Sequence, residues 1–138
     1  MGTGIEYICE YCGYMETISV GVGFHHSSLD TILDEVIQPC RDEVKDILTK
    51  FDVVKKEYDC KLYSCKTCKE IKVYNYVKLE YVDKDNKINI YKTVFKCNEC
   101  NKKLIEIKKM KNVYKCKCPK CKKLQSEIPK FPFMIDWD

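Results

Sequence analysis

The stretch CNECNKKLIEIKKMKNVYKCKCPKC, from Cys97 to Cys121, decides the fold that we expect for this chain. It contains two Cys-x-x-Cys pairs, Cys97/Cys100 and Cys118/Cys121, with residues 101–117 between them. Two cysteines spaced in this way reach one metal ion from a single tight turn, and a second such turn completes a tetrahedral set of thiolates. The sequence therefore predicts a four-cysteine metal site whose two turns are joined by a β-hairpin.

Two further pairs lie earlier in the chain, at Cys9/Cys12 and Cys65/Cys68. Eight of the 11 cysteines thus share one spacing, which metal coordination explains and disulfide pairing does not. A zinc ion with four cysteine ligands has no open position for a substrate, so we expect the metal to hold the fold. The predicted ligands of two Zn²⁺ ions are Cys9, Cys12, Cys65, Cys68, Cys97, Cys100, Cys118 and Cys121.

The sequence does not determine which turns share a metal ion, or which metal they bind. Of the three possible combinations we expect the sequential one, first with second and third with fourth, because intervening strands favour local closure. A cross-brace of alternate turns is the main alternative. Iron is an alternative to zinc, since spacing does not separate the two metals. Cys60 and Cys116 lie near turns and could replace a named ligand, whereas Cys40 fits a buried helix position.

The remaining pattern predicts an α+β fold, mostly antiparallel β. Apolar residues at helical spacing predict a helix–break–helix segment at 28–51, inserted into the first zinc-binding unit, with Pro39 in the first turn of the second helix. Strands are predicted at 5–12, 17–24, 57–64, 71–82, 87–96, 103–109 and 112–116. We expect units at 1–82, with the insertion at about 27–52, and at 83–138, joined in one compact molecule. Aromatic residues of the segment 128–138 would form a C-terminal strap.

The segment 97–121, with its Cys118-Pro-Lys-Cys121 turn, resembles a rubredoxin-type zinc ribbon. The turns at 9–12 and 65–68 resemble a second ribbon. The opening Cys9-x-x-Cys12-Gly13, with a later Gly-x-Gly-Phe at 21–24, is similar to uncharacterised small bacterial twin zinc-ribbon proteins. This resemblance implies a bacterial or phage origin and no particular activity. Zinc ribbons occur in transcription, translation and replication factors, so the class implies binding to nucleic acid or to a protein that handles it.

The charge is distributed unevenly along the chain. Residues 1–59 carry a net charge of −7, residues 60–123 carry +13, and residues 124–138 carry −2. Lysine supplies salt-dependent phosphate contacts and tyrosine can stack on a base, so we predict binding to RNA or DNA. A solvated lysine face, produced by AT-rich codons, is the competing explanation. Tyrosines at 74, 76 and 91 lie on the central hairpin; the predicted contact residues are Lys102, Lys103, Lys108, Lys109, Lys111, Tyr114, Lys115, Lys117, Lys120, Lys122 and Lys123.

Two other classes of function remain as alternatives. A protein-interaction adaptor or inhibitor, of the immunity or phage anti-defence type, would use the acidic helical insertion and the aromatic tail. An enzyme would need His25, His26 or Cys40, but the sequence contains no catalytic triad order, phosphate loop or metalloprotease motif, so we expect no enzyme. The sequence shows neither a signal peptide nor a membrane-spanning apolar run, which predicts a cytoplasmic protein without a membrane partner.

Overall fold

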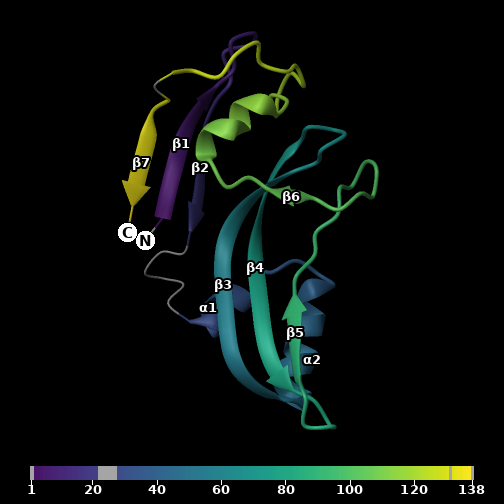
Figure 1. Cartoon of the computed structure of the whole chain (residues 1–138). Coiled ribbons are helices and arrows are strands. Elements are labelled where there is room, and N and C mark those ends of the chain that lie inside the picture. The colour runs from purple at the N-terminus through teal and green to yellow at the C-terminus, as the bar shows by residue number, and fades with distance from the viewer. Residues whose placement is uncertain (1, 22–27, 131, 138) are drawn as a thin grey trace.

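The computed structural model describes residues 2–21, 28–130 and 132–137, which form two antiparallel sheets with helices packed against them (Figure 1). One sheet has the strand order β2 (Met15–Gly21), β1 (Gly2–Ile8) and β7 (Met134–Trp137). The other has the order β5 (Ile88–Lys92), β4 (Ile71–Val82), β3 (Asp52–Ser64) and β6 (Ile105–Glu106). The helices are α1 (Leu29–Leu33), α2 (Cys40–Lys50) and the 3₁₀ helix η2 (Met110–Lys115). The predicted α+β class, mostly antiparallel β, is confirmed.

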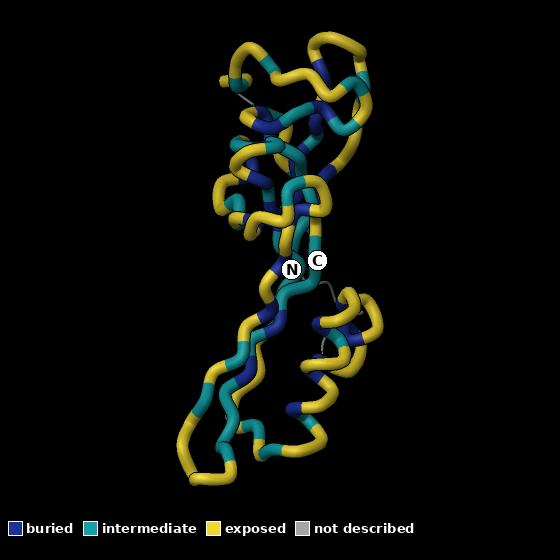
Figure 2. Tube along the Cα trace, turned by 90° about the vertical axis from the view of Figure 1, so that its right-hand side faces the viewer, coloured by how far each residue is buried: buried dark blue, intermediate teal, exposed yellow. Residues whose placement is uncertain are grey.

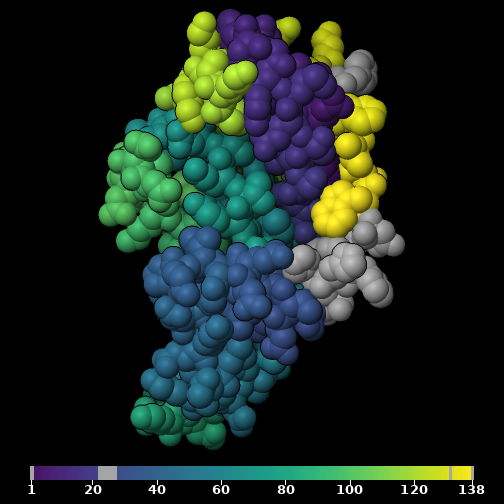
Figure 3. All heavy atoms as spheres, turned by 180° about the vertical axis from the view of Figure 1, so that it is seen from behind, coloured from purple at the N-terminus to yellow at the C-terminus, as the bar shows by residue number. Residues whose placement is uncertain are grey.

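The long β3–β4 hairpin is the axis of the molecule (Figure 1). Its register runs from Asp52↔Val82 at the open end to Ser64↔Ile71, where the second cysteine turn closes it. Helices α1 and α2 cover one face of the hairpin near its open end, and their buried positions face it (Figure 2). Seen from behind, the helices occupy the middle of the molecule and the three-stranded sheet lies at one end (Figure 3).

Two buried clusters fill the space between these elements. The helix-side core joins α1 and α2 to the hairpin, and Val36, Val44, Val77 and Leu79 have no exposed surface in it. The end core joins the three-stranded sheet to η2 and the closed end of the hairpin; its buried members are Ile5, Tyr7, Cys9, Ile18, Leu62, Met110, Val113, Tyr114 and Cys118. Each core therefore takes residues from both sides of position 82.

The segment after Cys100 differs most from expectation. The strand predicted at 112–116 is wrong, because residues 110–115 form η2 instead. Met110, Val113 and Tyr114 are its buried residues, and their i, i+3, i+4 spacing is that of a helix. The strand predicted at 103–109 shortens to β6, which pairs with β3 only at Tyr63↔Glu106 and Ser64↔Ile105.

The other strands lie near their predicted positions, with shifted ends, and residues 22–24 of the strand predicted at 17–24 lie outside the described residues. β3 begins at Asp52 rather than at 57, and a register shift near Val53 breaks its alternation. β5 ends at Lys92 rather than at 96, because the chain leaves the ladder at Thr93. There the Thr93 hydroxyl accepts the backbone N–H of Val77 at 3.1 Å and replaces a strand carbonyl.

The C-terminal tail forms part of a sheet. β7 pairs with β1 from Gly2↔Trp137 to Ile5↔Met134, so the two ends of the described chain lie side by side (Figure 1). Phe131 of the predicted strap lies outside the described residues, and the Phe133 side chain is 63% exposed. None of the helices in the described part of the chain is long and apolar enough to cross a membrane.

Candidate metal centres and basic groove

The four Cys-x-x-Cys turns share one backbone geometry. In each, the N–H four residues after the first cysteine donates to that cysteine's carbonyl, at 2.8–3.0 Å. The first cysteine's own N–H donates to the carbonyl five residues on, at 2.8–3.2 Å. The residue four positions after the first cysteine has a positive φ in every turn, at Gly13, Lys69, Asn101 and Lys122. This left-handed residue reverses the chain so that both thiols of a turn point to one side.

The eight predicted ligands form two groups of four, and within each group the sulfur atoms lie within 4.8 Å of one another. The outer cluster consists of Cys9, Cys12, Cys118 and Cys121, and the inner cluster of Cys65, Cys68, Cys97 and Cys100. The first turn therefore pairs with the fourth and the second with the third. The expected sequential pairing is wrong, and the cross-brace alternative is not found either.

This nested pairing follows from the sheets. β6 lies beside β3, which brings the turn after Phe95 to the closed end of the hairpin, where the second turn is. η2 packs on β1 and places the fourth turn beside the first, and the Tyr114 hydroxyl fixes this contact. That hydroxyl donates to the Glu6 carbonyl at 3.0 Å and accepts the Ile8 N–H at 3.3 Å. Contacts between segments distant in sequence therefore decide which turns pair, and the preference for pairing neighbouring turns does not.

The sulfur positions fit a tetrahedral metal ion. In the outer cluster Cys9 Sγ lies 3.6 Å from Cys121 Sγ, and Cys12 Sγ lies 3.7 Å from Cys118 Sγ. In the inner cluster, Cys65 Sγ and Cys100 Sγ are 3.5 Å apart. Four thiolates at the usual Zn–S length of about 2.3 Å would be separated by about 3.8 Å, whereas a disulfide needs about 2.05 Å. Both clusters can therefore hold a metal ion as they stand.

Hydrogen bonds prepare one thiol in each cluster for ionisation. Backbone N–H groups, that of Cys68 foremost, lower the pKa of the Cys65 thiol to about 6. Burial opposes ionisation of Cys9, but N–H donors, led by the backbone of Cys12 and the side chain of Gln125, lower its pKa to about 6. Hydrogen bonding to Cys100 raises the pKa of Cys68 to about 12. Four adjacent thiols cannot all ionise alone, and a divalent cation releases the remaining protons.

The outer cluster has a side-chain support that the sequence analysis missed. Gln125 Nε2 donates to Cys9 Sγ at 3.4 Å, while Gln125 Oε1 accepts the Glu10 N–H at 2.9 Å. Ser126 Oγ donates to the Glu10 carboxylate at 2.9 Å. These contacts attach the segment after the fourth turn to the first turn. A single glutamine near a cysteine gives no spacing signal, so only the fold shows this role.

Gln125→Ala is expected to weaken metal binding at the outer cluster alone, by about 10- to 100-fold, because it removes a hydrogen bond that orients a ligand. Competition with a chelator, followed by the metal content of the protein, measures this effect. One of the two metal equivalents should be lost at a lower chelator concentration than in the unchanged protein, while the other is lost at the same concentration as before. Equal weakening of both equivalents would contradict the assignment of Gln125 to the outer cluster.

The other cysteines do not replace the named ligands. Cys116 is 3% exposed and its pKa is raised by burial, and Cys60 has its pKa raised to about 11 by burial and by Asp59. Among the described residues, both lie outside the four-cysteine groups. Cys40 is 5% exposed at the start of α2, and burial raises its pKa as well, so it is a poor nucleophile. His25 and His26 lie outside the described residues.

Three of the predicted lysines line a groove of about 700 Å³ between β6 and η2. Lys108, Lys109 and Lys115 are all exposed, and Lys66 and Lys69 from the second cysteine turn also line the groove. The sequence analysis missed these two lysines. In the sequence they are marked only by their place in the second cysteine turn, and the fold brings the basic segment before η2 beside that turn. Glu106 is the one carboxylate among the described residues of the lining, and Lys61 neutralises it at 3.6 Å.

The other predicted contact residues are scattered around this groove. The prediction that Tyr114 contacts nucleic acid is wrong, because its side chain is 6% exposed. Its ring stacks on that of Tyr7 instead, with the ring centroids 5.0 Å apart. Lys122 pairs with Glu70 at 3.5 Å, and the Lys102 ammonium donates to the Thr67 hydroxyl at 3.0 Å. The remaining lysines outside the groove lining are Lys103, Lys111, Lys117, Lys120 and Lys123.

Comparisons of this chain with family models, with curated proteins and with solved structures give no match. The resemblance to zinc ribbons and to small bacterial twin-ribbon proteins therefore stays a prediction. What the structure establishes directly is a mostly antiparallel α+β fold with two four-cysteine clusters that can hold metal ions.

Proposed function

We propose that the chain is a non-enzymatic zinc protein that binds nucleic acid, free or in a nucleoprotein, through the lysine groove. One Zn²⁺ at each cluster would join segments distant in sequence and hold the walls of the groove in place. Zinc is favoured over other metals because four thiolates at tetrahedral spacing are its preferred structural ligands. With all four positions taken by protein, the metal would stabilise the fold and activate no water.

The observation that carries the nucleic-acid proposal is the concentration of lysine in one concave surface. Five lysines from two separate segments line the groove, namely Lys66, Lys69, Lys108, Lys109 and Lys115. A single row of lysines on a strand would be an ordinary solvated face. Two basic segments converge on one groove, and the carboxylate that the described part of the chain places in its lining, Glu106, is already paired with Lys61. This arrangement favours an anionic polymer as the ligand.

A binding titration at two salt concentrations tests this function. If the five lysines each contact one phosphate of a single strand, log K should fall with log salt with a slope of about −3.5. Affinity for a labelled single-stranded RNA or DNA should then decrease about a hundredfold between roughly 50 and 200 mM salt. Absence of binding to every labelled strand at low salt would reject the proposal.

A second candidate, an adaptor or inhibitor that binds one protein, is supported by the opposite side of the molecule. Exposed carboxylates lie at Asp34, just after α1, and at Asp42 and Asp46 in α2, and Met134 at the start of β7 is 45% exposed. Figure 3 shows these helices and β7 on the same face. A stoichiometric protein partner whose binding is abolished by Asp42→Lys and Asp46→Lys, and not by changes in the lysine groove, would favour this candidate.

A further inference from the structure

An aromatic pocket of about 540 Å³ opens beside the lysine groove, on the other side of β6. Tyr63 and Phe95 form its inner wall; they are 7% and 3% exposed, and their rings meet edge to face with centroids 5.1 Å apart. Tyr76 is the more exposed aromatic residue in the lining. The pocket thus has an aromatic interior of the size that small planar ligands occupy.

The rim of the pocket is cationic. Lys61, Lys92 and Lys103 lie in its lining, and the Lys61 ammonium sits 4.0 Å from the centroid of the Tyr76 ring. Glu106 holds the same ammonium at 3.6 Å, so Lys61 and Tyr76 have a defined position before any ligand binds. Lys61 covers one face of the Tyr76 ring and is paired with Glu106, so a planar ring can meet only the other face of Tyr76. Lys92 and Lys103 are the rim cations left for a phosphate attached to that ring.

The pocket and the groove are adjacent parts of one surface. Ile105 and Glu106 of β6 line both, so the pocket and the groove meet along this short strand. A chain that lies in the groove with its phosphates on the lysines can therefore place a side group in the pocket.

We propose that this pocket receives one unstacked nucleobase of a single strand whose phosphates lie in the lysine groove. The proposal rests on the nucleic-acid function and adds the class of nucleic acid that is bound. A base in a duplex is paired and stacked, so it reaches the pocket only after the duplex opens. Single strands, of RNA or DNA, are therefore the ligand, and Tyr76 is the base-stacking residue.

The test is a fluorescence-anisotropy titration of Tyr76→Ala with labelled single strands, with matched strands that lack their bases, and with a duplex. Loss of one stacked base should weaken binding of the normal strand about 5- to 100-fold. The strand without bases should bind the variant and the unchanged protein equally. Tyr76→Phe keeps the ring and should retain binding, which separates loss of stacking from loss of fold. Tyr11→Ala, at a 52% exposed tyrosine outside the pocket, is the matched control.

The outcomes distinguish the two proposals. If every strand fails to bind the unchanged protein at low salt, both the nucleic-acid function and the pocket assignment are wrong. If strands bind with the expected salt dependence, but Tyr76→Ala binds them as tightly as the unchanged protein does, the lysine groove stands and the base pocket is wrong. Equal affinity for the duplex and the single strand would also overturn the base pocket.

Discussion

Removal of metal from the outer cluster is expected to release the three-stranded sheet and η2 from the hairpin, while the helix-side core stays folded. The outer cluster joins turns more than 100 residues apart, since Cys9 and Cys121 are separated by 112 positions. Structural zinc in small domains contributes about 10–16 kcal/mol of apparent binding energy, as much as the whole stability of a typical domain. Among the residues that the structure describes, the end core has nine buried members, two of which are ligands of this cluster.

The measurement is amide hydrogen exchange on Cys118→Ser/Cys121→Ser compared with Cys97→Ser/Cys100→Ser. The first variant should lose protection in β1, β2 and η2 and keep it in α2 and in β4 near Leu79. The second variant should lose protection at the closed end of the hairpin, around β6. Identical loss in both variants would contradict two separable sites. Cys60→Ser, which leaves both clusters intact, is the control and should leave the exchange pattern unchanged.

Replacement of Lys108 and Lys109 by alanine is expected to produce the largest loss of nucleic-acid binding available from two surface changes. Both side chains are exposed and line the groove, and each should contact one phosphate. The slope of log K against log salt for a single strand should fall by about 1.4, since each contact contributes about 0.7. The measurement is the same anisotropy titration at several salt concentrations.

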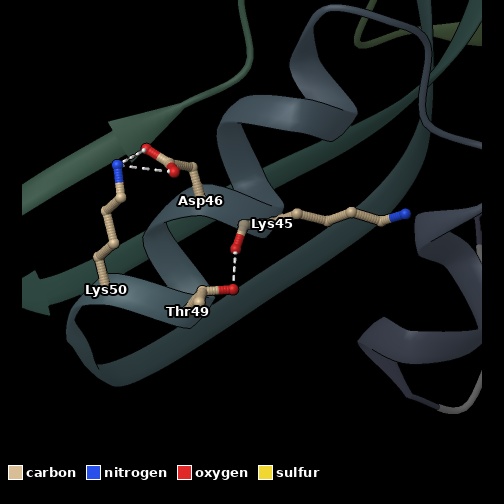
Figure 4. A network of polar contacts seen from close by, with 4 residues as sticks. All are labelled: Lys45, Asp46, Thr49 and Lys50. Atoms are coloured by element: carbon tan, nitrogen blue, oxygen red, sulfur yellow. Dashed lines mark hydrogen bonds and ion pairs between the residues drawn. The ribbon is translucent and has the colours of Figure 1, made fainter.

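Lys45 in α2 supplies the matched control for this pair. Figure 4 shows its side chain extending away from the helix, on a different side from Lys50, which pairs with Asp46 at 3.0 Å. Lys45→Ala removes a positive charge from outside the groove lining, and it should leave the salt slope unchanged. If Lys45→Ala and Lys108→Ala/Lys109→Ala weaken binding equally, the interaction is a general effect of net charge and the groove has no special role.

Local sequence signals predicted much of the fold. The helix–break–helix segment, β4 at 71–82 and the eight cysteines in their turns lie where spacing and alternation placed them. Each of these features depends on residues close together in the chain. The segment 110–115 shows the limit of this reasoning, because Val113 and Tyr114 favour a strand by residue type, while their spacing from Met110 gives the helix that packs on β1.

The pairing of the cysteine turns could not be derived in the same way. Four identical turns carry no information about their partners, and loop closure favours neighbours only weakly. The nested arrangement comes from strand order, since β6 joins β3 and η2 packs on β1. The lysine groove has the same origin, as Lys66 and Lys69 reach it only because the second turn lies beside the segment before η2.

The most direct test of the account is native mass spectrometry of the variant in which Cys9, Cys12, Cys118 and Cys121 are all replaced by serine. The unchanged protein should carry two zinc ions, and nested pairing predicts that this variant keeps one, in the inner cluster. Sequential pairing would leave each site with only two of its four ligands. A variant that retains no metal under conditions where Cys9→Ser/Cys12→Ser alone retains one, or an unchanged protein that carries none, would contradict the account.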